Sequence, residues 1–406
     1  MKLLATRGGR VRDLLAWVAL AALSGAAMAQ AQQIQGQPTT LASTADRMIS
    51  YRCQNHMWQT ADGATHAIIN RGPGLAGQSL ALFSTFDGGA TWINSGVSLP
   101  RSNGSSTSDG YLTGRRLRLT YDVGTSAIRY AEVTYDPTAR SWTLGKVQVV
   151  YKSDSAAALT PSIAADAKGR QWLAFTHQDK ASGDFSIKLM LRASGADPWV
   201  DTGLVFGAVD NLSNERAGRP VATERGIGMV FTVRAETYWA ERRNSWDLAR
   251  PWKQTLIDVK QAPSNDPYGT HFSIVADADF NLHMVSADGG NLLYSRYLAA
   301  DKAWQTRTLT ESQKTTYVQA TIAEGNVVLL GNSYTNVSVL QSTDGGETFE
   351  RTHALTHGAP AEDVSYNRPR IETPATSTGP VPVLQQYADG KIQRALFFAV
   401  PLVAPT

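Results

Sequence analysis

The sequence predicts an all-β chain folded as a seven-bladed β-propeller of four-stranded antiparallel blades. The clearest unit is residues 271–297, HFSIVADADFNLHMVSADGGNLLYSRY, in which three short strands are separated by Asp, Asn and Gly turns. A fourth strand, AWQTRTL, follows directly. Four meander-connected strands in about 40 residues match one propeller blade. Long helical periodicity is missing after the N-terminus, which also favours an all-β chain.

Six other segments resemble the first hairpin of this unit, which gives seven units in total. They are residues 56–69, 108–120, 160–175, 219–231, 319–330 and 368–384. An aromatic residue marks the fourth strand at a spacing near the blade period. These residues are Trp92, Trp142, Trp199, Trp252, Trp304 and Phe349. The alternative fold is a six-bladed propeller.

The N-terminus has the pattern of a secretory signal peptide at residues 1–29. A basic region precedes the apolar run 14–23, and Ala27-Met28-Ala29 forms a cleavage site. The apolar run is too short to span a bilayer. Residues 30–44 are expected to be a disordered linker, and residues 45–402 a single propeller domain. We expect the segment 47–53 to close the ring as the outer strand of the last blade, because an open end would expose a sheet edge. The location predicted is periplasmic or secreted.

Charge and cysteine content exclude several classes of protein. Residues 1–29 carry four basic residues and one acidic residue, a net charge that equals the +3 of the whole chain. The mature protein is therefore near neutral and has no basic tract for nucleic acid. Cys53 is the only cysteine, so no intramolecular disulfide can form, and we expect it in the core. The histidines show no metal-ligand spacing. We expect a monomer without metal or cofactor.

Two segments share a turn motif. Residues 85–92 read TFDGGATW and residues 342–349 read STDGGETF. In such a turn the Asp accepts backbone N–H groups, a Gly takes a positive φ and the aromatic packs under the loop. The motif resembles the Asp-box of sialidases and other BNR-repeat proteins. The resemblance implies that Asp87 and Asp344 lie between the third and fourth strands of a blade and have structural roles.

The unit at His271 is also similar to BNR-4 type proteins, which include seven-bladed polysaccharide lyases. The matching residues are His271, Leu282-His283 and Leu293-Tyr294-Ser295-Arg296. The resemblance covers most of the mature chain as architecture, and only this blade as a motif. It implies a site in which Arg, His and Tyr act on an acidic polysaccharide.

Candidate site residues follow from the repeat, because the first strand of each propeller blade lines the central channel. The residues that open these strands are His56, Ser108 or Asp109, Thr160, Arg219, His271, Gln319 and Arg368. We predict catalytic roles for four side chains with acid or base groups: His271, His56, Tyr268 and Tyr366. We predict substrate binding by Arg219, Arg368 and Gln319. The alternative role for Arg219 and Arg368 is a structural ion pair at the channel wall.

These residue types suit an acidic sugar. Arg binds a carboxylate bidentately, and His or Tyr can take the C5 proton of a uronate whose carboxylate is neutralised. The sequence therefore predicts a carbohydrate-active enzyme that cleaves a uronate-containing glycan by β-elimination. A sialidase-type exo-glycosidase is the first alternative, although a third carboxylate-binding Arg and a Tyr–Glu pair are not evident in the sequence. A non-catalytic propeller that binds glycan or protein is the second alternative.

Overall fold

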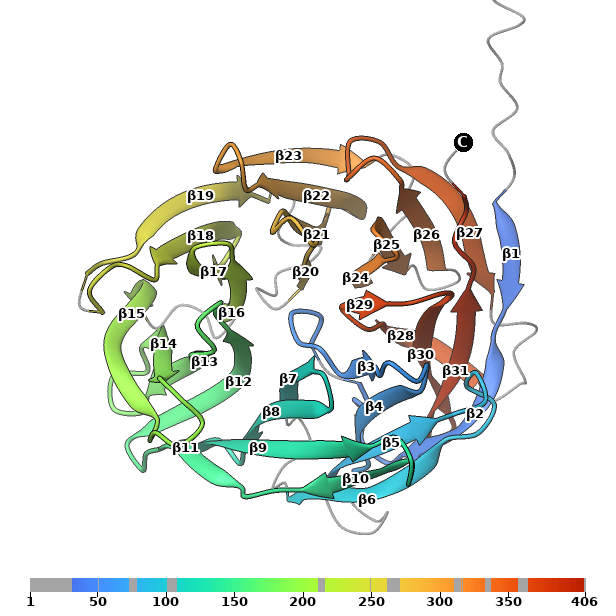
Figure 1. Cartoon of the computed structure of the whole chain (residues 1–406), viewed down its shortest axis with the longest axis horizontal. Helices are drawn as coiled ribbons and strands as arrows, with labels where there is room; N and C mark the ends of the chain where they lie inside the picture. Colours follow the sequence, from blue (N-terminus) through green and yellow to red (C-terminus); the bar gives the residue numbers. More distant parts are fainter. Residues whose placement is uncertain are drawn as a thin grey trace, which may run out of the picture. The chain divides into compact units, whose positions relative to one another are not determined.

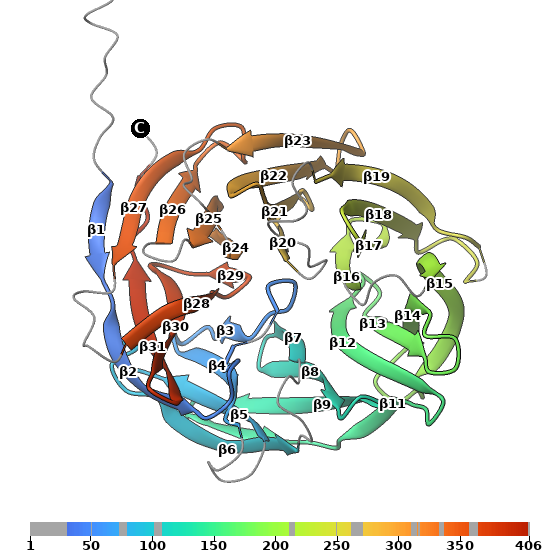
Figure 2. The same cartoon turned by 180° about the vertical axis from the view of Figure 1, so that it is seen from behind.

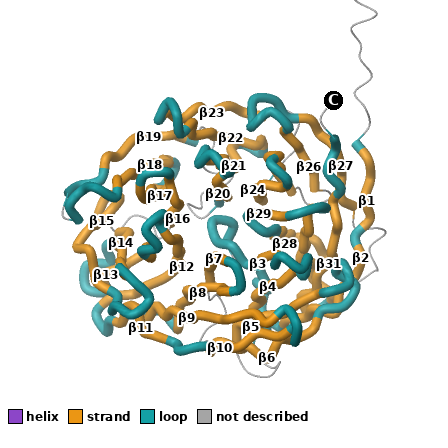
Figure 3. The backbone as a smooth tube through the Cα atoms, viewed as in Figure 1, coloured by secondary structure: helices purple, strands orange, loops and turns teal. Residues whose placement is uncertain are grey.

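The computed structural model describes residues 31–404 except 50, 73–78, 101–107, 211–215, 249, 261–270, 310–314, 316, 333–336 and 357–363. The chain divides into a short unit, Met1–Gln32, and a large unit, Gln33–Thr406. In the described residues every regular element is a β-strand (Figure 3). No described helix is long and apolar enough to cross a membrane. The predicted signal peptide lies outside the described residues.

The strands of the large unit form seven sheets arranged in a ring (Figures 1 and 2). Each of the first four sheets contains four strands that are consecutive in the chain, and the second sheet has one strand more. The first contains β3 (Met57–Gln59), β4 (Thr65–Asn70), β5 (Ser79–Thr85) and β6 (Ile93–Pro100). The second contains β7 (Ser108–Thr113), β8 (Arg116–Val123), β9 (Ala127–Asp136) and β10 (Ser141–Leu144), and β11 (Gln148–Lys152) also pairs with β9. The third contains β12 (Ala156–Ala165), β13 (Gln171–Asp179), β14 (Phe185–Arg192) and β15 (Val200–Asp210). The fourth contains β16 (Arg216–Thr223), β17 (Gly226–Val233), β18 (Glu236–Arg243) and β19 (Lys253–Val259).

Two further sheets follow the same pattern, and the last is built from both ends of the chain. The fifth contains β20 (Phe272–Ala276), β21 (Leu282–Asp288), β22 (Asn291–Leu298) and β23 (Ala303–Leu309). The sixth contains β24 (Tyr317–Ala323), β25 (Asn326–Asn332), β26 (Val337–Ser342) and β27 (Glu350–Thr356), flanked by β1 (Gln32–Gln35) and β29 (Thr376–Ser377). The seventh contains β28 (Val364–Glu372), β30 (Val381–Asp389), β31 (Ile392–Val400) and β2 (Gln37–Ser43).

The prediction of an all-β propeller is confirmed, and the seven sheets agree with the seven units counted in the sequence. Six of the described sheets contain four consecutive strands each, and the seventh completes its four strands with β2 from the N-terminal part of the chain. The predicted closing strand was wrong. The outer strand of the seventh sheet is β2, whereas residues 47–53 lie in the loop that follows it. The segment expected to be a disordered linker therefore forms β1 and β2.

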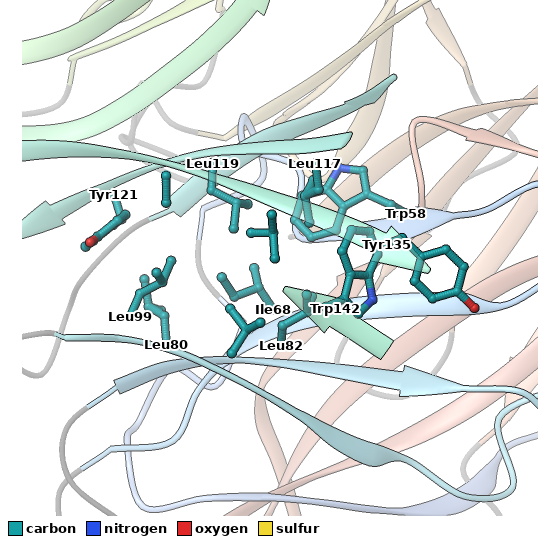
Figure 4. Close-up of a cluster of buried hydrophobic side chains, with 13 residues drawn as sticks. Trp58, Ile68, Leu80, Leu82, Leu99, Leu117, Leu119, Tyr121, Tyr135 and Trp142 are labelled. Atoms are coloured by element: carbon teal, nitrogen blue, oxygen red, sulfur yellow. The ribbon is translucent and has the colours of Figure 1, made fainter. Parts of the chain in front are cut away.

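The core lies between adjacent blades, where the apolar faces of neighbouring sheets meet. Figure 4 shows the cluster between the first two blades, in which Trp58 and Ile68 of the first blade face Leu117 and Trp142 of the second. The six recurring aromatic residues all lie at the start of a fourth strand or just before it, as predicted. Trp142 is one of these residues and is 5% exposed. The sequence repeat therefore reflects one packing position in successive blades.

Both turns that share the TFDGGATW/STDGGETF motif have the predicted geometry. Asp87 lies between β5 and β6, and its carboxylate accepts the backbone N–H of Thr91 at 3.0 Å and the hydroxyl of Thr85 at 2.8 Å. Hydrogen bonds from Thr91 and Thr85 lower the pKa of Asp87 to about 2. Gly89 has φ 95°, and a Cβ there would overlap the ring of Phe397. Glycine is therefore required at this position for two independent reasons.

The second turn, between β26 and β27, repeats this arrangement. Asp344 accepts the backbone N–H of Thr348 at 2.9 Å and the hydroxyl of Ser342 at 2.7 Å. Although burial opposes the shift, these hydrogen bonds lower the pKa of Asp344 to about 2. The carboxylate is thus a structural acceptor, which agrees with the role implied by the motif.

We expect Asp344→Ala to lower the free energy of unfolding by about 1 kcal/mol, a low value because the carboxylate is exposed to water. The folded-state pKa of Asp344 is depressed, so its contribution exists above about pH 4 and is lost as the pH falls toward 2. Urea denaturation at neutral pH and near pH 2 measures both effects. Asp301→Ala, in another exposed turn, is the control. Equal stability of the two variants at neutral pH would contradict the prediction.

Candidate functional site at the ring centre

The loop between β2 and β3, residues 44–56 and called here the central loop, projects toward the middle of the ring (Figure 1). Its C-terminal part is bound to several blades. The side chain of Gln54 donates to the carbonyl of Pro161 in β12 at 2.7 Å. The backbone N–H of Asn55 donates to Asp109 in β7 at 2.8 Å. Cys53 packs among apolar residues of the fourth and fifth sheets, and burial raises the pKa of its thiol to about 12. The prediction that Cys53 is a core residue is confirmed.

His56 and Glu372 form a buried pair at the end of the central loop. The backbone N–H of His56 donates to Oε1 of Glu372 at 3.1 Å. The ring Nδ1 of His56 lies 3.0 Å from Oε2 of the same carboxylate. The two side chains are only 3% and 1% exposed. One residue of the central loop thus engages both oxygens of a carboxylate on β28.

Asp109 and Arg219 form a second buried pair, which joins the second blade to the fourth. Nη1 of Arg219 donates to Oδ2 of Asp109, and the backbone N–H of Ile163 donates to the same oxygen at 2.7 Å. Burial raises the pKa of Asp109, and the charge of Arg219 opposes this shift. Arg219 therefore has the structural ion pair that the sequence left open as the alternative.

Tyr317, the first residue of β24, lies beside two guanidinium groups. The Cζ of Arg52 is 3.9 Å from the centroid of the Tyr317 ring, and the Cζ of Arg370 is 5.8 Å from it. Both distances are within the range of cation–π attraction. Burial raises the pKa of Tyr317, the charges of Arg370 and Arg52 oppose the rise, and the charge of Glu372 adds to it. The phenol, the carboxylate and the two guanidiniums thus belong to one electrostatic cluster.

We define the central cluster as seven side chains gathered by the central loop and the inner strands. They are Arg52, His56, Asp109, Arg219, Tyr317, Arg370 and Glu372. Burial raises the pKa of Glu372, with the charge of His56 opposing the rise and that of Asp109 adding to it. Burial also lowers the pKa of Arg370. In the described ranges, no group of three or more His, Cys, Asp or Glu side chains is placed to hold a metal ion.

The structure brings some of the predicted site residues together but leaves others unplaced. His56 and Arg219 belong to the central cluster. Gln319 is buried and ties three blades, because it accepts from Ser273 at 3.0 Å and donates to the carbonyl of Ile371 at 3.4 Å. His271 precedes β20 and is partly exposed.

The remaining predicted residues lie in parts of the chain that the structure describes incompletely or not at all. Tyr268 is outside the described residues. Tyr366 and Arg368 are in β28, but the description there extends only to the backbone. Their predicted roles, like that of His271, stay predictions.

Four members of the central cluster were not predicted as site residues from the sequence: Arg52, Tyr317, Arg370 and Glu372. Arg52 was assigned to a closing strand. Arg370 and Glu372 follow Arg368 at intervals of two, so alternation alone would have placed all three on one face of β28. The register of β28 shifts between Ser365 and Arg370, so simple alternation does not hold along the whole strand.

Comparisons with known proteins show similarity of fold. No family model matches the sequence, and no curated protein matches it. The NanB sialidase from Streptococcus pneumoniae is 10% identical, with 85% of each chain covered and a TM-score of 0.47. An α-L-arabinanase from Penicillium chrysogenum is 11% identical, with 90% of this chain and 99% of that chain covered and a TM-score of 0.47.

A lectin is also similar in fold. Aleuria aurantia lectin, described as a six-bladed β-propeller, is 10% identical, with 74% of this chain and 96% of that chain covered and a TM-score of 0.42. At such identities the similarity concerns the β-propeller fold alone. None of these three proteins is a polysaccharide lyase, so that resemblance gains no support from them. The fold and the site define a β-propeller with a buried cluster of Arg, Tyr and carboxyl side chains at its centre.

Proposed function

We propose that the central cluster binds a carboxylate-bearing sugar and that the protein is a glycoside hydrolase acting on it. The observation that carries the proposal is the approach of the guanidiniums of Arg52 and Arg370 to the ring of Tyr317. A third carboxylate-binding Arg and a Tyr–Glu pair were the two elements that the sialidase-type alternative lacked in the sequence.

The balance of charge in the central cluster favours an anion. Its described residues include three guanidiniums, those of Arg52, Arg219 and Arg370, against the carboxyls of Asp109 and Glu372. Burial raises the pKa of both carboxyls, and the charges of Arg219 and His56 oppose the rise. Because the mature chain is near neutral overall, affinity for an anion has to come from such a local group. Arg370 is partly exposed and would meet a carboxylate first.

The phenol and carboxyl provide a route to bond cleavage. The Tyr317 oxygen bonds to the anomeric carbon while Glu372 takes the phenolic proton. The bond from that carbon to the leaving oxygen breaks, and this oxygen takes a proton from water. A second water then adds to the anomeric carbon and gives a proton to the hydroxide left by the first water. The bond from that carbon to the Tyr317 oxygen breaks, and this oxygen regains its proton from Glu372. An uncharged phenol as nucleophile suits an anionic sugar, since a carboxylate nucleophile would repel the substrate carboxylate.

The elimination chemistry predicted from the sequence receives less support from this geometry. It required an Arg free to neutralise a uronate and an imidazole free to take a proton. Arg219 is bound to Asp109, and the ring of His56 is bound to Glu372. The proposed hydrolysis assigns its chemical roles to Tyr317 and Glu372 and leaves both of these contacts in place.

A panel of aryl glycosides tests the proposal. Glycosides of sialic acid, glucuronic acid and galacturonic acid are compared with those of glucose and galactose, and release of the aryl group is followed. We expect turnover of at least one acidic glycoside and none of its neutral counterpart. Polymers of uronic acid are added to detect unsaturated products, which would show elimination instead. Saturable binding without turnover would indicate the non-catalytic alternative, and equal turnover of acidic and neutral glycosides would contradict the proposed role of the arginines.

A further inference from the structure

Glu372 is held by a residue that lies more than 300 positions away in the chain. Both of its oxygens meet His56, one through the backbone N–H at 3.1 Å and the other through the ring Nδ1 at 3.0 Å. Two donors on two oxygens fix the plane of a carboxyl group as well as its position. A packing contact alone would not require this arrangement.

The position of His56 is set independently of β28. Its neighbour Asn55 is bound to Asp109, and Gln54 is bound to the carbonyl of Pro161. Both contacts are with other blades, so the central loop brings the imidazole to a place defined by the ring. The carboxylate of Glu372 then binds to a donor pair that is already in place.

The charged and titratable groups around Glu372 come from four elements. His56 and Arg52 lie on the central loop, Asp109 on β7, Tyr317 on β24 and Arg370 on β28 itself. Of the groups that act on the carboxyl, His56 favours its ionised form, whereas burial and Asp109 favour the neutral form. The acceptance of a proton from Tyr317 requires an ionised Glu372.

We propose that His56 is a positioning residue that orients Glu372 and keeps it ionised as the acceptor for the Tyr317 proton. This inference rests on the function proposed above and extends it, because it makes the central loop part of the site. His56 does not touch the substrate in this scheme. It acts through the carboxyl group that it holds.

The first test observes Glu372 directly and needs no substrate. The protein is labelled with 13C at the Glu side-chain carboxyl, and the Glu372 signal is assigned by its loss in Glu372→Gln. We expect His56→Ala to raise the titration midpoint of Glu372 by about one pH unit or more, because charge and hydrogen bonds shift carboxyl groups by about that amount. His56→Asn, which keeps a short side-chain donor, should raise it less.

The control is His353→Gln, which alters another buried histidine whose ring contacts Thr352 rather than the central cluster. The Glu372 midpoint should not change in this variant. If His56→Ala does not fold, His56→Asn decides the question by the same measurement. An unchanged midpoint in the folded His56 variants would overturn the inference.

The second test separates this inference from the proposed function. On an acidic aryl glycoside that the wild type hydrolyses, His56→Ala should lower kcat about 10-fold or more, with a small change in KM, and should move the acidic limb of the pH profile upward. Loss of kcat with an unmoved pH profile would contradict the positioning role of His56 but not the proposed function. If the wild type hydrolyses no glycoside of the panel, the proposed function fails, whereas the 13C titration still decides whether His56 controls Glu372.

Discussion

Replacing Tyr317 with Phe should reduce turnover of an acidic glycoside by a factor of about 10³ or more. The phenolic oxygen is the proposed nucleophile, and phenylalanine has no group that can replace it. The aromatic ring remains, so the contacts with Arg52 and Arg370 and the packing of β24 should persist. KM should therefore change little, and single-turnover kinetics should show that no covalent intermediate accumulates.

The matched control for this variant is Tyr121→Phe. Tyr121 is fully buried in β8, in the core between the first two blades, and lies outside the central cluster. Its variant should retain wild-type kcat. Thermal unfolding of both variants should stay within a few degrees of the wild type, which separates chemistry from folding. If Tyr317→Phe keeps more than about a tenth of wild-type kcat, the nucleophile has been assigned wrongly.

Lowering the pH from about 7 to about 4 should cost the protein about 3 kcal/mol of folding free energy through His66 alone. Trp142 donates to the ring Nδ1 at 3.1 Å, so the proton of the neutral imidazole is on Nε2, 2.9 Å from the hydroxyl of Thr60. A second proton on Nδ1 would face a donor in a buried site. Burial accordingly lowers the pKa of His66 from 6.5 to about 4, although Asp62 opposes the shift.

The sign follows from the direction of this shift. As the pH is lowered from about 6.5 to 4, the unfolded chain takes up a proton at His66 and the folded protein does not. The free energy of unfolding therefore decreases as the pH decreases over that window. His66→Gln removes the titrating group, and its free energy of unfolding should depend less steeply on pH there, by about 3 kcal/mol in total. Urea denaturation at several pH values measures this. Parallel curves for variant and wild type would show that His66 does not carry the effect.

The fold was largely predictable because its repeat is written in local patterns. Short alternating strands, turn residues and a phased aromatic in six of the seven blades were enough to locate the blades. The closing strand was not predictable in this way. β2 has the sequence QPTTLAS, whose only large apolar residue is Leu41, and it gains its stability from pairing with β31. Residues 47–49 and 51–53 are more apolar, yet they lie in the loop that follows β2. There Met48 and Ile49 pack with the first and seventh blades and Cys53 with the fourth and fifth.

The site was predictable only in part, for a related reason. The repeat locates the start of each inner strand, and so indicated His56, Asp109 and Arg219 as residues near the channel. It carries no information on which side chains pair across the channel. The contact of His56 with Glu372 depends on the path of the central loop and on the irregular register of β28, and both are properties of the assembled ring.

The placement of β2 beside β31 has a consequence for the order in which the protein folds. The hydroxyl of Thr39 donates to the carbonyl of Ala395, so partners 356 positions apart in the chain must meet before the ring is closed. During synthesis the first of these strands emerges early and has no partner until the last blade is complete. Contacts of such high sequence separation form slowly, because the whole intervening chain must first be ordered. Until then the edge of β31 stays open and prone to pairing with other chains, so a nascent or incomplete chain is the form most at risk of aggregation.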